Sequence, residues 1–201
     1  MNRFNEKSAK SYNEKADHYD STPEGRYTLD FKDKLLLVMS VNRGAYVLDV
    51  ACGNGTLLKM LADRYGIIGY GTDISENMIE NARRKNPGMI FETAGCESMP
   101  FESHFFDIIT VCAAYHHFPD VKAFAAEAHR LLKAGGCLYI ADVYYPALVR
   151  FLCNPFVPLS KAGDVRFYSP KEIRKTFENS GFRLLNNNIS GHIQLAAFQK
   201  I

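Results

Sequence analysis

The sequence predicts an α/β fold: a doubly wound, mostly parallel β-sheet with helices on both faces and an antiparallel C-terminal hairpin. From residue 45 onward, strand-like and helix-like segments alternate, and the strands are apolar on both faces. Both features are typical of parallel sheets buried between layers of helices. The last two strand-like segments follow each other with no helix between them, which favours antiparallel pairing. Right-handed crossovers should align the carboxyl ends of the parallel strands at one edge, where ligands bind.

The elements are expected in the following order. Residues 1–44 are amphipathic and predict helices with a break at STPEG, residues 21–25. Strands are expected at 45–50, 67–73, 89–95, 105–114 and 137–145, and helices at 56–66, 75–88 and 121–136. Ser75 and Ser169 are expected to cap helices, the second of them over 169–181 with Glu172 completing a capping box. Strands 182–189 and 192–200, joined by a Ser-Gly turn, form the hairpin.

Residues 146–168 contain three prolines and fit no regular element. Long irregular segments in compact domains are often lids or binding loops. We therefore expect a lid on the substrate side, and an apolar loop packed only for stability is the alternative.

Composition excludes several classes of protein. The 201 residues are 47% apolar with a formal net charge of +2, which gives no electrostatic case for a nucleic-acid or anionic-membrane partner. The polar N-terminus lacks the apolar segment of a signal peptide, and no run approaches the roughly 20 apolar residues of a membrane span. Five cysteines without a Cys-x-x-Cys pair predict reduced thiols, a cytoplasmic location, no disulfide framework and no zinc site.

The stretch VLDVACGNG, residues 47–55, places Asp49 ahead of Gly53 and Gly55 after a strand. A dinucleotide fingerprint needs a third small residue, but Leu58 stands there, and no Gly-Lys-Ser/Thr follows. A carboxylate would also repel a phosphate. It would instead attract an ammonium or a sulfonium, while the glycines let backbone atoms approach the ligand.

Asp73 ends the second predicted strand in GTDIS. A carboxylate at that place can accept hydrogen bonds from a ribose diol. Together the two acids indicate a nucleoside ligand with a positive centre and no phosphate, which describes S-adenosylmethionine. The alternatives are that Asp49 caps turn amides and that Asp73 only supports the start of a helix.

VLDVACGNG, GTDIS, CESMPF and FDIITVCAAYHH resemble, in order, the motifs of class I S-adenosylmethionine-dependent methyltransferases, in the small-molecule branch that includes quinone-biosynthesis C-methyltransferases. RFYSPKEIRKTFENSGF and ADHYD resemble flanking segments of that family, so the likeness covers nearly the whole chain. It implies a Rossmann-like fold in one domain over residues 1–201. Its parts would be a helical cap (1–44), a cofactor-binding core (45–142), a substrate-side loop or lid (143–168), and a C-terminal helix and hairpin (169–201).

The resemblance also implies roles for single residues. The methionine part of the cofactor would be faced by Asp49, Ala51, Gly53 and Gly55. Asp73 would bind the ribose hydroxyls, while the adenine would be contacted by Ile74, Met78, Cys96 and Glu97. Cys112 would lie near the transferred methyl group. The family often has an aspartate where this chain has Gly95. Either a backbone carbonyl or Glu97 accepts the adenine amino group in its place, or the affinity for the cofactor is lower.

Candidate bases are His116 and His117, just after the fourth strand, because neutral imidazole suits proton removal. Packed histidines are the alternative, and adjacent side chains point apart, so at most one should face the substrate. Candidate substrate contacts are Tyr19, Tyr115, Tyr144 and Tyr168, for which plain packing is the alternative. No metal ion is expected.

The sequence thus predicts methyl transfer from S-adenosylmethionine to a small organic acceptor. The motifs of DNA amino-methylating, protein arginine and catechol-type enzymes are missing after the fourth strand. The alternatives are a protein that binds S-adenosylmethionine or S-adenosylhomocysteine without transferase activity, and, less favoured, a nicotinamide dehydrogenase. The sequence does not indicate the oligomeric state.

Overall fold

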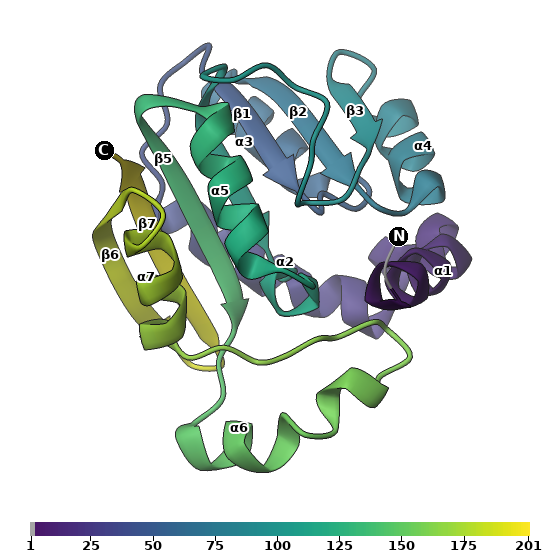
Figure 1. The fold of residues 1–201 in the computed structure, drawn as a ribbon. Helices are drawn as coiled ribbons and strands as arrows, with labels where there is room; N and C mark the ends of the chain where they lie inside the picture. Colours follow the sequence, from purple (N-terminus) through teal and green to yellow (C-terminus); the bar gives the residue numbers. More distant parts are fainter. Residues whose placement is uncertain (1–2) are drawn as a thin grey trace.

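The computed structural model describes residues 3–201 and contains a seven-stranded sheet of order β3-β2-β1-β4-β5-β7-β6 (Figure 1). The strands are β1 (Tyr46–Val50), β2 (Ile68–Asp73), β3 (Ile90–Thr93), β4 (Phe106–Cys112), β5 (Leu132–Val143), β6 (Phe182–Ser190) and β7 (Ile193–Lys200). The first five strands are parallel, whereas β7 pairs antiparallel with both β5 and β6. The predicted fold class is confirmed. The strand order reverses between β1 and β4, which is where such sheets bind ligands.

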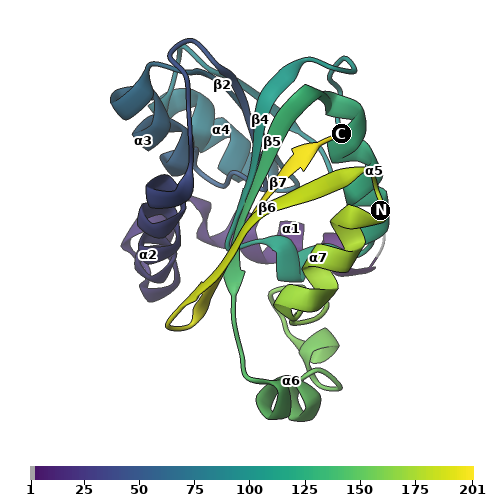
Figure 2. The same ribbon diagram turned by 90° about the vertical axis from the view of Figure 1, so that its left-hand side faces the viewer.

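Helices cover both faces of this sheet. The α-helices are α1 (Arg3–Lys15), α2 (Pro23–Val38), α3 (Thr56–Tyr65), α4 (Glu76–Lys85), α5 (Val121–Leu131), α6 (Ala147–Cys153) and α7 (Pro170–Glu178). Three short 3₁₀ helices are η1 (Ala16–Ser21), η2 (Tyr115–His117) and η3 (Val157–Leu159). Figure 2 shows the sheet nearly edge-on, with α2, α3 and α4 on one side and α5 and α7 on the other. No helix within residues 3–201 is long and apolar enough to cross a membrane.

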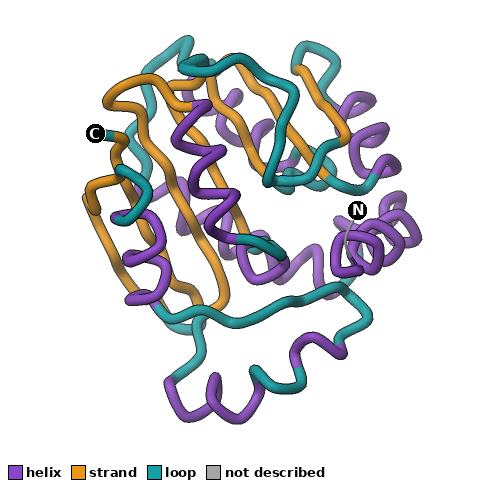
Figure 3. The backbone as a smooth tube through the Cα atoms, viewed as in Figure 1, coloured by secondary structure: helices purple, strands orange, loops and turns teal. Residues whose placement is uncertain are grey.

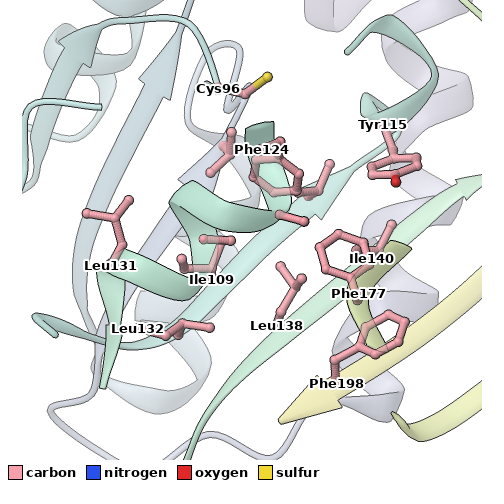
Figure 4. Packing of buried hydrophobic residues seen from close by; sticks show 14 of the residues in the cluster. Cys96, Ile109, Tyr115, Phe124, Leu131, Leu132, Leu138, Ile140, Phe177 and Phe198 are labelled. Atoms are coloured by element: carbon pink, nitrogen blue, oxygen red, sulfur yellow. The ribbon is translucent and has the colours of Figure 1, made fainter. Parts of the chain in front are cut away.

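Two hydrophobic cores flank the sheet. On one face, Phe124 of α5 and Phe177 of α7 pack against Ile109, Leu138 and other strand residues (Figure 4). On the other face, apolar residues of α2, α3 and α4 pack against the opposite side of the same strands. The strands are therefore buried on both faces, which explains why their sequences are apolar without alternation.

Side-chain caps fix the helix starts that the sequence predicts. Ser75 Oγ accepts the amide of Met78 at 3.2 Å. Ser169 and Glu172 form the expected reciprocal capping box at α7. Thr22 caps α2 ahead of Pro23, so the predicted break over residues 21–25 is confirmed and is short.

Two predicted segments differ in the structure. The helix expected over 121–136 ends at Leu131, because Leu132 is fully buried and pairs with Phe106 as the first residue of β5. The segment 146–168, expected to be irregular, contains α6 and η3, and none of the residues of α6 is buried. In Figure 3 this segment runs below the sheet, out to α6 and back past α1 before entering α7.

Candidate functional site

A cavity of about 970 Å³, including space at its open mouth, lies at the carboxyl ends of β1, β2 and β4. Ten of the residues singled out from the sequence line this cavity: Asp49, Ala51, Gly53, Asp73, Ile74, Met78, Cys96, Cys112, Tyr19 and His117. Its position at the ends of parallel strands, beside the point where the strand order reverses, is where such sheets bind small molecules or cofactors. The predicted residues that lie outside its lining are Gly55, Glu97, His116, Tyr115, Tyr144 and Tyr168.

Asp49 carries an ionisable carboxyl group that is almost completely buried from solvent. Asp49 is the second-last residue of β1 and is only 2% exposed. The hydroxyl of Thr110 donates to its Oδ1 at 2.7 Å. Burial raises the pKa of Asp49 to about 7, although Thr110 and the nearby Lys32 act against that rise. An unliganded protein at neutral pH thus holds this carboxyl close to its titration midpoint.

Asp73 joins the glycine-rich turn to the start of α4. Its Oδ2 accepts the amide of Gly53 at 2.8 Å, and its Oδ1 accepts the amide of Ser75 at 2.9 Å. Burial raises its pKa, partly offset by these amide donors. Each carboxylate oxygen has a second acceptor position, so the residue can hold the turn and still accept ligand hydroxyls.

The turns at this edge of the sheet contain strained backbone. Gly53 has a φ of +52°, and Ala51 and Ala113, after β1 and β4, have φ values of +58° and +54°. Residues other than glycine rarely adopt this left-handed backbone conformation, and those that do often lie at functional sites. All three line the cavity.

Gly55 serves packing rather than the cavity. A Cβ at this position would lie 2.8 Å from Nδ2 of Asn86 and 3.1 Å from the ring of Phe91. Its φ of +75° also requires glycine. Glycine at this position therefore lets α3 begin close to β3 and α4. The sequence analysis had instead predicted that Gly55 faces the methionine part of the cofactor.

At the expected adenine edge, Gly95 and Cys96 line the cavity, but Glu97 does not. The side chain of Asn5, from α1, also lines it and comes within 3.9 Å of a Cβ built at Gly95. An amide group from the N-terminal helix thus occupies the region where the family usually places an aspartate.

The two histidines of η2 have different surroundings. His116 lies outside the cavity lining, and its Nδ1 is 2.6 Å from Oδ1 of Asp142 on β5. Burial lowers its pKa, but the carboxylates of Asp142, Asp164 and Glu24 together outweigh burial and the net shift is upward. His117 lines the cavity, and its Nε2 is 3.2 Å from the hydroxyl of Tyr12. Burial and the neighbouring His116 lower the pKa of His117, which keeps this imidazole neutral.

Of the four tyrosines predicted to contact substrate, only Tyr19 lines the cavity. Tyr115 is fully buried in the core beneath α5 and α7 (Figure 4). Tyr168 packs on Tyr115 with ring centroids 5.1 Å apart, so its ring belongs to the same core. The backbone amide of Tyr144 pairs with the carbonyl of His192, next to the start of β7. Packing therefore accounts for the placement of Tyr115 and Tyr168.

Helices α1 and α2 supply cavity residues that the sequence analysis did not single out, among them Asn5, Ser8, Tyr12, Thr28 and Lys32. Lys32 donates to the hydroxyl of Thr28 at 2.7 Å. Their i,i+4 spacing places both on one helix face, but nothing in the sequence shows which surface that face meets.

Comparison with known proteins finds similarity to methyltransferases over part of the chain. Residues 48–140 match the family described as "Methyltransferase domain". The demethylmenaquinone methyltransferase of Chlorobaculum parvum is 32% identical over 157 residues, covering 77% of this chain and 62% of that protein. The ubiquinone biosynthesis O-methyltransferase of Coxiella burnetii is 29% identical over 156 residues, covering 72% of this chain and 66% of that protein. The chain therefore spans less than two thirds of the length of these relatives.

A solved structure shows the same fold over the full chain. The geranyl diphosphate C-methyltransferase of Streptomyces coelicolor, solved with S-adenosyl-L-homocysteine, superposes with a TM-score of 0.79. The match covers 100% of both chains at 12% identity. At that identity the likeness concerns the fold alone.

Proposed function

We propose that this chain is a class I S-adenosylmethionine-dependent methyltransferase and that it transfers the methyl group of S-adenosylmethionine to a small, mostly apolar organic acceptor. One observation carries the proposal: Asp49 and Asp73, both buried, line one cavity at neighbouring strand ends beside the left-handed Gly53. Two carboxylates there suit a cationic nucleoside and oppose a pyrophosphate.

Each part of the cofactor has a matching group in the cavity. Asp49 suits the cationic end, because a buried carboxylate attracts an ammonium or sulfonium strongly. Lys32, in the same lining, suits the carboxylate of the methionine part. Asp73 retains acceptor capacity for the ribose diol. Ile74 and Met78 supply apolar contact for adenine.

The adenine amino group needs an acceptor, because Gly95 has no side chain. The amide group of Asn5 supports this role, since Asn5 lines the cavity and its Nδ2 lies 3.9 Å from a Cβ built at Gly95. A half-turn of that amide would present its carbonyl oxygen, the acceptor, at the same place. We therefore propose that an N-terminal residue replaces the aspartate that the family carries in the core.

The cofactor supplies the reactive group, and the protein aligns the acceptor behind the methyl carbon and excludes water. Cys112 ends the strand that borders this part of the cavity, and Ala113 follows it. A hydroxyl or acidic-carbon acceptor also needs a base. His117 is the histidine that the cavity reaches and is held neutral, so it remains our candidate, while His116 and Asp142 pack behind it.

The acceptor class follows from the relatives and from the cavity. The named relatives act on demethylmenaquinone or in ubiquinone biosynthesis, so quinone precursors head the list of acceptors to test. The cytoplasmic location, the absence of a nucleic-acid partner and the division into segments remain predictions from the sequence.

Calorimetric titration of the full chain with S-adenosylmethionine and S-adenosylhomocysteine tests the cofactor. We expect Asp73→Ala to weaken binding by at least about 1.5 kcal/mol, with exposed Asp63→Ala as the matched control. Because Asp73 also holds Gly53, a thermal unfolding curve for each variant must accompany the titration. The absence of binding at millimolar cofactor would refute the proposal.

Transfer of a labelled methyl group to a panel of quinone precursors and other small acceptors tests the reaction. Tight cofactor binding without transfer to any acceptor would favour the alternative, a non-catalytic binding protein. NAD should leave the unfolding temperature of the protein unchanged. A clear rise in that temperature would support the alternative hypothesis of a nicotinamide dehydrogenase.

A further inference from the structure

Beside the cavity, His116 and His117 of η2 face Asp164, which lies in the loop before α7. Nδ1 of His117 is 3.1 Å from Oδ1 of Asp164, and Nε2 of His116 is 3.6 Å from the same oxygen. One ligand atom from each residue lies within 4.8 Å of the others. Asp164 is so far from the two histidines in the sequence that motif spacing does not predict this cluster.

Both histidines have their outer ring nitrogen held by an oxygen. Asp142 holds Nδ1 of His116 at 2.6 Å, and the hydroxyl of Tyr12 holds Nε2 of His117 at 3.2 Å. Tyr12 in turn donates to Glu24 at 3.0 Å. Metal-binding histidines are usually oriented in this way, by a carboxylate or another oxygen on the second nitrogen.

The inner ring nitrogens both approach the same carboxylate oxygen of Asp164 instead. Nδ1 of His117 is buried and makes no hydrogen bond within the described part of the chain. In a tetrahedral site with bonds of about 2.0–2.1 Å, neighbouring ligand atoms are about 3.3–3.4 Å apart. The two nitrogen-to-oxygen separations, 3.1 and 3.6 Å, bracket that value, and all three ligand atoms lie within 4.8 Å of one another.

The backbone holds Asp164 in place. The amides of Val165 and Arg166 both donate to the carbonyl of His116, at 2.9 and 3.2 Å. Gly163, at φ +81°, passes so close to α1 that a Cβ there would lie 2.8 Å from the carbonyl oxygen of Phe4. The three candidate ligands are thus arranged before any ligand arrives.

We propose that His116 Nε2, His117 Nδ1 and the Asp164 carboxylate bind one divalent transition-metal ion, with zinc as the best match. Imidazole and carboxylate ligands suit zinc, whereas magnesium and calcium prefer oxygen ligands alone. Three protein ligands leave one tetrahedral position for water or for an oxygen of the acceptor. Because His117 lines the cavity, the ion would border the acceptor. With Nδ1 on the ion and Nε2 on Tyr12, His117 could not also act as the base, so the metal site would replace that proposed role. The site goes beyond the proposed function and is opposite to the metal-free expectation from the sequence.

Titration of the chelator-treated full chain with Co²⁺ and Zn²⁺ tests the site. We expect one equivalent of Co²⁺ to bind and give the visible absorption of a four-coordinate nitrogen and oxygen site, which Zn²⁺ then removes. Asp164→Asn and His117→Gln should weaken binding at least about tenfold, and Asp142→Asn, which acts through His116, about 10- to 100-fold. The matched controls are Asp63→Asn and His18→Gln, both exposed, which should leave binding unchanged.

Three results would overturn the site: no Co²⁺ binding at millimolar metal, equal affinities in Asp164→Asn and the parent chain, or a thiolate charge-transfer band showing that cysteines hold the ion. Asp164 keeps 20% of its side chain exposed, so Asp164→Asn should fold even if the variants at His116 or Asp142 do not. S-adenosylhomocysteine titration of the same variant separates the proposals, because cofactor binding should survive loss of the metal site.

Discussion

Asp49 illustrates how a single residue can serve binding at the expense of the unliganded fold. Its carboxyl is buried, one hydrogen bond from Thr110 supports it, and its pKa rises from near 3.8 to about 7. The folded chain therefore binds this proton more tightly than the unfolded chain between pH 4 and pH 7. Through this group, stability falls as pH rises across that range and is level above it.

Asp49→Asn should therefore stabilise the unliganded protein at pH 8, by at least about 1 and at most about 4 kcal/mol, the upper value being the whole pKa shift. Asparagine keeps the acceptor for Thr110 without the charge. The advantage should shrink as pH falls toward 5. Urea unfolding at both pH values measures it, and a destabilised variant at pH 8 would contradict the burial cost.

The same carboxyl predicts the pH dependence of cofactor binding. Below pH 7, Asp49 must lose a proton before it can pair with a cation, so affinity for S-adenosylmethionine should fall about tenfold from pH 8 to pH 6. Asp49→Asn should bind weakly and with a flatter pH profile. Calorimetry at several pH values checks this, and an equally steep profile in the variant would assign the dependence to another group.

Gly95 offers a gain-of-function prediction. Its φ lies outside the left-handed region, and an added Cβ would meet the flexible end of Glu97 at 3.0 Å and the amide of Asn5 at 3.9 Å. Gly95→Asp should restore the adenine acceptor and tighten S-adenosylhomocysteine binding by about 1 kcal/mol, roughly fivefold. Gly95→Ala is the control and should change little.

Asn5→Ala and Gly95→Asp together form a double-mutant cycle that tests whether the two positions share the acceptor role. If its amide carries the acceptor role, Asn5→Ala should weaken binding in the parent chain and much less in Gly95→Asp. Equal losses in both backgrounds would show that the two positions act independently.

At the scale of elements, α7 shows how local chemistry supports the core. Ser169 Oγ accepts the amide of Glu172 at 3.2 Å, and Glu172 accepts the amide of Ser169 at 2.8 Å. The helix then buries Ile173 and Phe177 against the sheet. A weak start to this helix would loosen those core contacts.

Ser169→Ala should therefore lower the free energy of unfolding by about 1 kcal/mol, while S-adenosylhomocysteine affinity is unchanged because Ser169 lies outside the cavity lining. Urea unfolding measures the loss. Ser98→Ala, at an exposed position, is the control, and an equal loss there would remove the capping explanation.

Across the whole molecule, the N-terminal helices complete a site that the sheet begins. Asn13 of α1 accepts the hydroxyl of Ser75 at 2.7 Å, and the Asn77 side chain donates to the Asn13 carbonyl at 3.1 Å. Figure 1 shows α1 lying beyond the arrowheads of the parallel strands. The cap and the sheet therefore share one cavity, and a ligand there contacts both.

Cofactor binding should thus order the cap. Amide hydrogen exchange of residues 3–21 should slow at least about tenfold on saturation with S-adenosylhomocysteine, because opening the cap would expose bound ligand. Exchange in β6, at the far edge of the sheet, should not change. Equal slowing in both regions would indicate global stabilisation instead.

The sequence by itself determined the sheet, the helix caps and the two acids, because apolar patterning, serine caps and residues at strand ends are local signals. It placed Asp49 and Asp73 correctly at neighbouring strand ends, since parallel crossovers align those ends in any such fold. Local signals gave a different prediction where burial determined the structure. Tyr115 was predicted to contact substrate, but its ring packs in the hydrophobic core. The helix predicted to continue to residue 136 ends at Leu131, because Leu132 pairs in β5.

Only the tertiary structure decided which distant residues share the cavity. Asn5 reaches Gly95, and Asp164 reaches His116 and His117, across more than 40 residues of chain in each case. The physical reason is that a sheet edge gathers whatever the flanking loops and helices bring to it, and the packing of those segments depends on surfaces that no short stretch of sequence encodes.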